Sequence, residues 1–245
     1  MIPVAWRRVL APPVFLRLAE RLAPWLGTSA LALITCGLVW GLALAPADRV
    51  QGEGYRILYI HVPAAWLSLF VYVTMAGAAV LALVWRIKLA ELAVLASAPV
   101  GMSFTFLALV TGSLWGKPMW GTFWVWGDAR LTSELVMFFL YLGVMALAQA
   151  IEEPRRAARA AALLAIIGVI NVPIIHFSVL WWNTLHQGPT VFRRGGPAIA
   201  TSMLLPLLAN ALGFTLFYGW VLLLRMRVLL LHREHRRRWA IEATS

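Results

Sequence analysis

The chain has 245 residues, of which 62% are hydrophobic and only 13% are charged, and its mean hydropathy is +0.80. A soluble domain carries about 25% charged residues, so this composition excludes an ordinary soluble enzyme and indicates a protein that lies in a lipid bilayer. The net charge of +11 comes from short basic clusters between apolar runs, which is typical of membrane loops rather than of a nucleic-acid-binding surface.

Six apolar runs are long enough to cross about 30 Å of hydrocarbon. In chain order they are residues 27–46, 62–85, 92–115, 131–151, 158–182 and 199–224. Because the backbone must satisfy its own hydrogen bonds in lipid, each run predicts a helix. The predicted fold class is therefore an all-α integral membrane protein with six transmembrane helices. Pro63 falls at the start of the second run, where its missing N–H costs nothing. Pro99, Pro173 and Pro206 lie inside later runs and predict kinks.

This pattern divides the chain into three parts. Residues 1–26 form an N-terminal segment, residues 27–224 form the six-span domain, and residues 225–245 form a basic tail. Residues 14–25 are predicted to lie along the membrane surface as a short amphipathic helix. The basic tail is predicted to rest on anionic lipid, with His232 and His235 in solvent.

The distribution of lysine and arginine predicts the orientation. With the N-terminus inside, the cytoplasmic segments hold Arg7, Arg8, Arg17, Arg21, Arg86, Lys88, Arg155, Arg156, Arg159, Arg225, Arg227, Arg233, Arg236, Arg237 and Arg238. The outer segments hold only Arg49, Arg56, Lys117, Arg130, Arg193 and Arg194. This bias predicts that both termini are cytoplasmic and that the loops at residues 47–61, 116–130 and 183–198 lie outside.

The second outer loop is rich in tryptophan. Four of the chain's 13 tryptophans, Trp115, Trp120, Trp124 and Trp126, fall within twelve residues. One interpretation is an aromatic belt at the membrane–water interface. However, a belt is spread over all spans, whereas this cluster occupies one loop. The alternative is a rigid aromatic platform on which a large flat ligand stacks.

Two histidines lie on the neighbouring outer loops. His61 precedes the second span and His186 follows the fifth, whereas His176 lies about 9 Å below the outer end of that span. Each could be a hydrogen-bonded structural residue. Because His61 stands at a predicted helix N-terminus, its neutral form is favoured, and neutral imidazole is the commonest axial ligand of haem iron.

The remaining chemistry of the outer face favours haem over zinc. The outer loops offer few other histidine or carboxylate ligands and no cysteine, since the only cysteine, Cys36, lies in the first span. The chain has no Cys-x-x-Cys-His sequence, so it is neither a thiol oxidoreductase nor itself a c-type cytochrome. Non-covalent, b-type haem held by two histidines fits best.

Three segments carry a resemblance to a known family. The sequence WGTFWVWGDARLTSEL (120–135) resembles the tryptophan-rich WWD motif of membrane proteins that handle haem during cytochrome c maturation. Together with YIHVPAAW (59–66), NVPIIHFSVLWWNTLHQGPT (171–190) and the six spans, the chain is similar to the haem exporter protein C family (cytochrome c maturation protein C). The resemblance covers nearly all of the chain outside its termini.

The resemblance implies roles for particular residues. His61 and His186 would be the axial ligands of the haem iron. The haem platform, which would also dock a periplasmic haem chaperone, would comprise Trp115, Trp120, Phe123, Trp124, Trp126 and Asp128. The common motif has Trp where this chain has Phe123 and lacks Gly127, which puts the placement of Asp128 in doubt.

Three of these residues keep alternative interpretations. Asp128 precedes the fourth span and could simply cap that helix. Arg130 could pair with Asp128 or contact a haem propionate. His176 could be a further ligand in another state or could pack inside the helix bundle.

At the level of function, the resemblance implies a multi-pass protein of the bacterial inner membrane. It would bind haem at the periplasmic face and deliver it to the periplasmic chaperone for c-type cytochrome biogenesis. Its partners would be the ATPase and membrane subunits of an ATP-binding cassette transporter and a small single-span subunit. The chain has no phosphate-binding GxxxxGK[ST] sequence, which agrees with ATP being handled by another chain. It would be a transport component rather than an enzyme, although a lyase-like role in forming the chaperone–haem adduct stays open.

Three alternatives remain at this point. A haem lyase of the same superfamily would be longer, with more spans and more histidines. A solute permease would need polar groups near the membrane midplane, where Asn171, Asn210 and Gln149 are the evident candidates. A structural scaffold would use the histidines and tryptophans for anchoring alone.

Overall fold

The computed structural model describes residues 11–188, 190–191 and 193–242, and in this part of the chain six helical stretches are long and apolar enough to cross a membrane. The helices are α2 (Pro12–Val39), α3 (Leu58–Trp85), α4 (Lys88–Trp120), α5 (Ala129–Ala150), α6 (Pro154–Gly168), α7 (Asn171–Trp181), α8 (Thr201–Glu234) and α9 (Arg238–Glu242). The π-helix η1 (Trp40–Leu44) extends α2, and the 3-10 helix η2 (Glu53–Ile57) precedes α3. The predicted six-span, all-α membrane class is confirmed.

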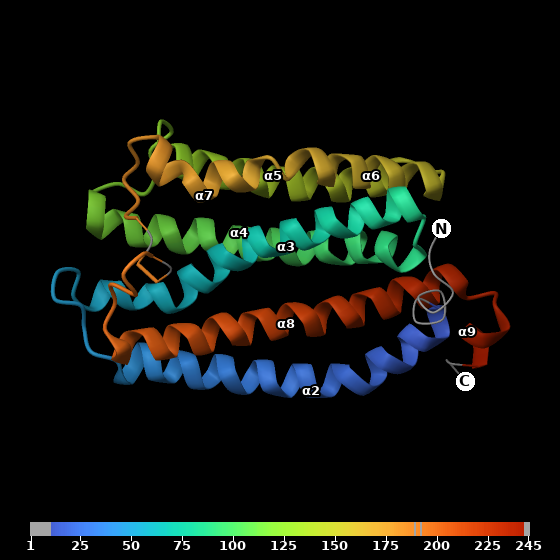
Figure 1. The fold of residues 1–245 in the computed structure, drawn as a ribbon, viewed down its shortest axis with the longest axis horizontal. Coiled ribbons are helices and arrows are strands. Elements are labelled where there is room, and N and C mark those ends of the chain that lie inside the picture. The colour runs from blue at the N-terminus through green and yellow to red at the C-terminus, as the bar shows by residue number, and fades with distance from the viewer. Residues whose placement is uncertain (1–10, 189, 192, 243–245) are drawn as a thin grey trace.

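The helices form three layers (Figure 1). The central layer is α3 with α4; α2 with α8 covers one side, and α5 with α6 and α7 covers the other. The start of α2 and the end of α8 lie at the same end of the bundle, as six spans require. The connections from α2 to α3, from α4 to α5 and from α7 to α8 gather at the opposite end, here named the loop end. Which end faces the cytoplasm stays a prediction, and Arg7 and Arg8, which contributed to it, lie outside the described residues.

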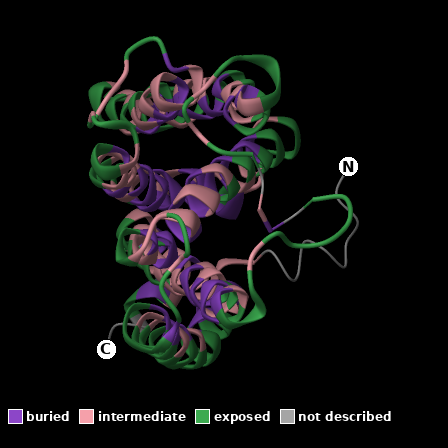
Figure 2. Ribbon diagram, turned by 90° about the vertical axis from the view of Figure 1, so that its left-hand side faces the viewer, coloured by how far each residue is buried: buried purple, intermediate pink, exposed green. Residues whose placement is uncertain are grey.

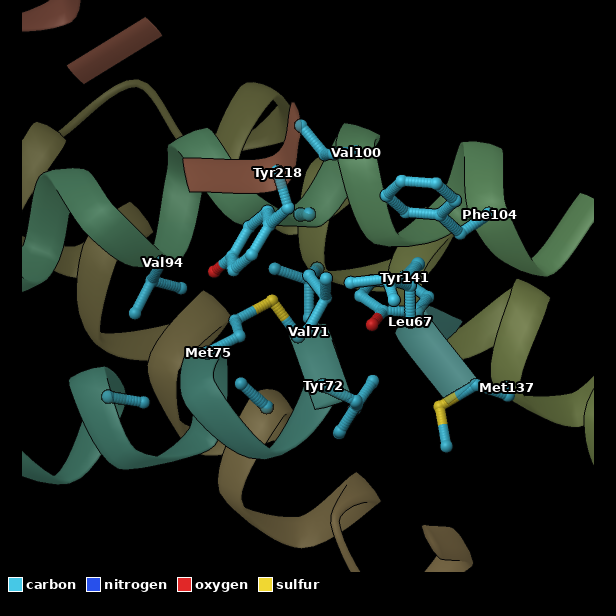
Figure 3. Close-up of a cluster of buried hydrophobic side chains, with 14 of the residues drawn as sticks. Leu67, Val71, Tyr72, Met75, Val94, Val100, Phe104, Met137, Tyr141 and Tyr218 are labelled. Atoms are coloured by element: carbon cyan, nitrogen blue, oxygen red, sulfur yellow. The ribbon is translucent and has the colours of Figure 1, made fainter. Parts of the chain in front are cut away.

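The interior is mostly apolar, and two of its tyrosines, Tyr141 and Tyr218, pair their hydroxyls with other helices, whereas the hydroxyls of Tyr59 and Tyr72 have no partner among the described residues. Tyr141 donates to the carbonyl of Ser68 (2.7 Å), and the hydroxyl of Tyr218 lies 2.9 Å from that of Ser97. Figure 3 shows these rings among the buried side chains of α3, α4, α5 and α8. Each such hydrogen bond contributes about 1 kcal/mol and leaves no buried hydroxyl unpaired at that point. The first bond fixes the register of α5 against α3, and the second fixes that of α8 against α4.

The outer surface of the helices is also apolar. Large hydrophobic side chains are exposed along every long helix, among them Leu31, Phe70, Phe106, Phe139, Ile167 and Leu212. Figure 2, viewed along the helices, shows the buried residues concentrated inside and the exposed ones around them. A soluble protein rarely exposes so much apolar surface, whereas in a bilayer this surface contacts lipid.

Two ends of the bundle differ from the sequence prediction because helices run further than the apolar runs. Helix α2 begins at Pro12 and continues without a break past residue 26, so residues 14–25 extend the first span and are not a separate surface helix. Helix α8 likewise continues to Glu234, through the first part of the predicted tail. Hydropathy marks the apolar length of each span, but backbone hydrogen bonding and packing of α2 against α8 carry both helices beyond the apolar runs.

The prolines have different consequences. The fifth span is interrupted between α6 and α7, at Val169 and Ile170, four and three residues before Pro173. The proline cannot donate to the carbonyl four residues earlier, and the chain there forms shorter i to i+3 bonds, such as Ile170 N–H to the Ile167 carbonyl (3.4 Å). Helices α4 and α8 continue through Pro99 and Pro206. Pro63 lies inside α3 and not at its first position, because α3 begins at Leu58.

Candidate functional site

Two histidines meet at the loop end of the bundle. His61 lies in the first turn of α3, and His186 lies in the segment between α7 and α8. Their ring centroids are 6.4 Å apart, with the ring planes inclined by 33°. The structure thus brings together the two residues that the sequence singled out.

His61 lies further from the start of a helical segment than the sequence predicts. Helical turns continue backward from α3 through η2 to Glu53, so His61 is not at an exposed helix start. The helix dipole acts mainly within the first turn. Instead, a hydrogen bond determines which ring nitrogen of His61 carries a proton.

Hydrogen bonds identify the proton-bearing nitrogen of each ring. The Thr111 hydroxyl donates its one proton to the Leu107 carbonyl (2.6 Å), so it accepts from Nδ1 of His61, 3.0 Å away. Nδ1 of His186 lies 2.9 Å from the Gln187 carbonyl oxygen, which can only accept. Both rings therefore carry a proton on Nδ1, and in its neutral form each ring keeps the Nε2 lone pair, which is the arrangement of a metal-binding histidine.

The ring separation suits two ligands of one metal ion. A metal–imidazole bond is about 2 Å long, and a ring nitrogen lies about 1 Å from its ring centroid. Two such ligands on opposite sides of an ion therefore place their centroids about 6 Å apart, close to the observed 6.4 Å. The described residues contain no group of three or more His, Cys, Asp or Glu side chains that could hold a metal. The protein thus offers two nitrogens, the number that haem iron takes as axial ligands.

A cavity surrounds both histidines. It contains about 1060 Å³ of non-atom space, counting the part open to solvent. Its walls include Leu109, Trp115, Met119, Trp120, Ile175 and Leu185, and its polar lining includes Gln51, Arg130, Glu134 and Gln187. A mostly apolar hollow with a few polar groups and two free imidazole nitrogens fits a flat apolar macrocycle that carries a metal and two carboxylates.

Trp115 lines the cavity and contacts His61. Its ring meets His61 edge-to-face, with centroids 5.7 Å apart, and its Nε1–H donates to Oε1 of Gln51 (2.9 Å). One turn earlier on α4, a Cβ added at Gly112 would lie 2.9 Å from the imidazole Cε1. Only glycine leaves room for the ring at that point, so Gly112 and Trp115 of α4 both contact the imidazole.

The surroundings of His186 keep its ring neutral. Burial, followed by the nearby positive charge of Arg130, lowers the pKa of His186 to about 4. The ordinary value is about 6.5. The ring is therefore uncharged near neutral pH, as a metal ligand must be.

The tryptophan-rich segment is divided between two surfaces. Helix α4 continues to Trp120, and Gly121 ends it in the left-handed conformation (φ 76°), so the loop proper is shorter than predicted. Trp115 and Trp120 line the histidine cavity. The rings of Trp124 and Trp126 pack edge-to-face, with centroids 5.5 Å apart. They line a separate apolar groove between α4 and α5, with about 930 Å³ of non-atom space, counting the part open to solvent.

Two further side chains in this region are Phe123, on the exterior, and Leu109, at the boundary between the outer groove and the histidine cavity. Phe123 is exposed, with the Lys117 ammonium 5.3 Å from its ring centroid. Leu109 lines both the histidine cavity and the outer groove, so it separates the two. The segment therefore presents one aromatic pair to the cavity and a second, with Phe123, to the exterior.

Asp128 links the fourth span to the histidine loop. Its Oδ1 accepts from the backbone N–H groups of Arg130 (2.9 Å) and Leu131 (3.0 Å), which caps α5. Its Oδ2 accepts from the N–H of Leu185 (2.8 Å), next to His186. The carboxylate is buried and both oxygens are used, so the capping interpretation describes its geometry, with the loop contact in addition.

Comparison with known proteins identifies the family of this chain. The model of the family "Heme exporter protein C" matches residues 5–241. The chain is 53% identical over 231 residues to the heme exporter protein C of Escherichia coli (strain K12), covering 94% of this chain and 93% of that protein. The chain belongs to the haem exporter protein C family.

Further relatives support the assignment. The heme exporter protein C of Haemophilus influenzae is 52% identical over 228 residues (93% of this chain and 92% of that protein). The corresponding protein of Rhodobacter capsulatus is 39% identical over 217 residues (88% and 89%). The similarity to haem exporter protein C thus extends across all six spans.

The structure bears on two residues of this haem exporter protein C family member for which the sequence left alternatives open. His176 is exposed on α7 and does not pack inside the bundle; its ring contacts Phe177 edge-to-face at 4.7 Å. Arg130 lines the cavity and forms no ion pair with Asp128 within 4.0 Å among the described residues; its Nη1 donates to the Ile175 carbonyl (3.4 Å). Gly127 has open space around it and no positive φ, so the added residue leaves Asp128 in its capping position.

Sequence reasoning missed Glu134 and Thr111. Glu134 lies five residues into α5, is buried, lines the cavity, and its Oε1 has no hydrogen-bond partner among the described residues. A carboxyl group inside an apolar run is itself a sign of function, so this signal was available. Thr111 gave no such signal, because its role depends on the register between α3 and α4.

Proposed function

We propose that this member of the haem exporter protein C family acts in haem export for cytochrome c biogenesis by binding non-covalent, b-type haem at the loop end and passing it to a periplasmic chaperone. His61 and His186 bind the iron from opposite sides. The observation that carries the proposal is the pair of imidazoles, 6.4 Å apart, each with its proton fixed on Nδ1. Bound haem supplies an iron that accepts two imidazole ligands.

The residues around the pair have complementary tasks. Trp115, Trp120 and Leu109 cover the apolar macrocycle, at about 25 cal/mol per Å² of buried surface. The guanidinium of Arg130, which has no carboxylate partner within 4.0 Å in the described part of the chain, meets a propionate. Asp128 acts as a positioning residue through the Leu185 N–H.

Delivery uses the outward part of the tryptophan-rich segment. Phe123, Trp124 and Trp126 lie outside the histidine cavity, and Phe123 and Trp126 are exposed. Exposed aromatic side chains are frequent at protein interfaces. They form the docking surface for the chaperone, with haem reached through the adjoining cavity.

The wider assignment follows the family. The loop end faces the periplasm, the protein lies in the bacterial inner membrane, and the ATPase and membrane subunits of a transporter and a small single-span subunit are its partners. Its role is transport rather than catalysis. The buried carboxyl group of Glu134 does not support the permease alternative. It lies only about 8 Å along α5 from the first residue of that helix, and not at the membrane midplane where a permease would need it.

A transfer experiment tests delivery separately from binding. The haem-loaded protein is mixed with the apo-chaperone, and the chaperone–haem adduct is measured per haem initially bound. We expect Trp124→Ala to keep most of its haem and to transfer little of it, while His61→Ala loses haem itself. Trp85→Ala, at the opposite end of the bundle, is the matched control. A Trp124→Ala ratio equal to that of the wild type would contradict the docking role.

A further inference from the structure

A second hollow lies at the end of the bundle opposite the histidines. It is formed where α3 and α4 are joined, where α6 begins and where α8 ends, and contains about 1610 Å³ of non-atom space, counting the part open to solvent. Its charged lining consists of Arg86, Lys88, Glu91, Arg155, Arg159, Arg233 and Glu234. Five cations against two carboxylates give this basic cavity a net charge of +3.

The two carboxylates are already occupied. Glu91 pairs with Arg233 (3.1 Å). Glu234 pairs with Lys88 and, more distantly, with Arg237 (3.5 Å). These pairs tie α8 to the start of α4 and neutralise one another.

Three arginines of the basic cavity remain without an ion pair among the described residues: Arg86, Arg155 and Arg159. They come from the end of α3 and from the first turns of α6. All three are exposed to solvent around one hollow, so together they offer positive charge and several hydrogen-bond donors to a single anion.

The backbone at Arg86 gives an independent indication. Arg86 follows the last residue of α3 in the left-handed conformation (φ 55°, ψ 39°), and it is the one non-glycine residue with positive φ in the described part of the chain. Glycine is the favoured residue at such a helix end, and a residue with a Cβ is disfavoured there. An arginine at this position costs stability, which indicates a role for its side chain in the cavity.

The level of the basic cavity is that of the membrane interface. The exposed Trp85 ends α3 beside it, and tryptophan is enriched where hydrocarbon meets the headgroups. Ala82, Leu83 and Ala158 supply an apolar part of its lining. The hollow therefore combines a basic part with an apolar part at the depth of lipid headgroups.

We propose that this cavity binds the phosphate group of an anionic phospholipid from the leaflet on the side of the chain termini. Guanidinium groups donate paired hydrogen bonds to phosphate oxygens, and basic pockets between transmembrane helices bind lipid headgroups. The interfacial level and the apolar lining favour a lipid over a soluble phosphate. The overall excess of basic residues at this end explains attraction to the membrane surface, but not a hollow with three unpaired arginines.

The test compares two lipids that differ only in headgroup. The whole protein, purified in detergent and stripped of lipid, is titrated with phosphatidylglycerol or with phosphatidylcholine of the same acyl chains. Bound lipid is counted by native mass spectrometry, and thermal unfolding is followed in parallel. We expect preferential binding of phosphatidylglycerol, with a thermal stabilisation that phosphatidylcholine does not give.

Three variants locate the binding site. Arg86→Gly relieves the backbone strain and so keeps the fold, and Arg155→Gln and Arg159→Gln remove the other free cations. Each is expected to weaken phosphatidylglycerol binding about fivefold. Arg156→Gln is the control, because Arg156 follows Arg155 on the same helix, is exposed, pairs with Glu153 and does not line the cavity.

Four results would overturn the proposal. Equal binding of the two lipids would remove the headgroup specificity, and unchanged binding by Arg86→Gly would remove the site. An equal loss in Arg156→Gln would mean a diffuse surface effect. Inorganic phosphate that displaces the lipid at equal concentration would identify a soluble phosphate as the ligand. None of these results depends on haem.

Discussion

At the scale of single residues, the chemistry of the histidine pair depends on neighbours that are not ligands. Thr111 accepts from His61 because its own proton goes to the Leu107 carbonyl. Removing such a partner of a metal ligand typically costs 10–100-fold in affinity. We therefore expect Thr111→Val to weaken haem binding by about that factor in a titration of the apoprotein followed by absorbance.

The controls for this prediction come from the same helix. Thr111→Ser keeps the hydroxyl and should bind haem as the wild type does. Thr105→Val removes a similar buried hydroxyl, which donates to the Gly101 carbonyl (2.8 Å) and lies outside the cavity. If Thr111→Val binds haem as tightly as Thr105→Val, the assignment of the His61 tautomer is wrong.

The pKa of His186 gives a second residue-scale prediction. Burial and the charge of Arg130 lower it to about 4, so His186 should stay neutral as the pH falls from about 7 to about 5. Diethyl pyrocarbonate modifies only neutral imidazole, so the midpoint of His186 modification in the apoprotein, resolved by peptide mass spectrometry, should fall near pH 4. A midpoint near the ordinary value of about 6.5 would contradict the account.

The same pKa predicts the direction of the stability change. An exposed imidazole in the unfolded chain takes up its proton near pH 6.5, and His186 in the folded chain does so only near pH 4. Between these values the unfolded state binds more protons, so the contribution of His186 to the free energy of unfolding decreases as the pH is lowered. Above about pH 6.5 this contribution is constant.

At the scale of elements, Asp128 joins two segments that are far apart in the sequence. Its Oδ1 caps α5 and its Oδ2 holds the Leu185 N–H, beside His186. Asp128→Asn keeps one oxygen for the cap but presents an NH₂ group toward the Leu185 N–H. Since a hydrogen bond to a charged group contributes about 1.5–3 kcal/mol, we expect haem affinity to fall at least about tenfold, with added imidazole restoring part of the low-spin spectrum.

A second helix cap provides the comparison for Asp128. Glu153 caps α6 by accepting from the Arg155 N–H (3.2 Å), at the opposite end of the bundle. Glu153→Ala should lose about 1 kcal/mol of stability and leave the haem spectrum unchanged. If Asp128→Asn behaves in the same way, its carboxylate is only a cap.

The elements also show how far the sequence could predict the structure. Six apolar runs predicted six spans, because the cost of unpaired backbone groups in lipid leaves helices as the solution. Helix ends were less predictable, since the hydropathy of residues 116–120 does not reveal that α4 continues until Gly121 stops it. The division of the tryptophans between cavity and groove follows from that extra turn.

The site was predictable where a residue type carries chemistry by itself. His61 and His186 stand out in the sequence, and the structure places them together. For His176 the sequence left open a further ligand role or packing inside the bundle, and the structure instead exposes it on α7. Thr111 and Gly112 matter only because of the register between α3 and α4, which no local pattern encodes.

At the scale of the whole molecule, the two ends of the bundle have opposite characters. The loop end carries the histidine cavity, whereas the end with the termini carries the basic cavity. The bias of lysine and arginine predicts that the termini face the cytoplasm. This orientation would place the histidine cavity on the periplasmic side, where the proposed delivery takes place.

Cysteine labelling tests the orientation. In a Cys36→Ser background, Ala47→Cys and Ala198→Cys introduce exposed thiols at the loop end, and Glu152→Cys introduces one at the other end. In intact spheroplasts we expect an impermeant maleimide to label the first two and not the third, which should react only after permeabilisation. Labelling of position 152 from outside would contradict the predicted orientation, in which the chain termini face the cytoplasm.

The most direct test of the account is the absorption spectrum of haem bound to the protein and to its histidine variants. For the wild type we predict a low-spin spectrum of iron with two imidazole ligands. His61→Ala and His186→Ala should each shift it toward high spin and weaken haem retention, and added imidazole should restore much of the low-spin form. His176→Ala, with its histidine on the exterior, should match the wild type. A wild-type low-spin spectrum in both His61→Ala and His186→Ala would contradict the claim that these two residues hold the iron.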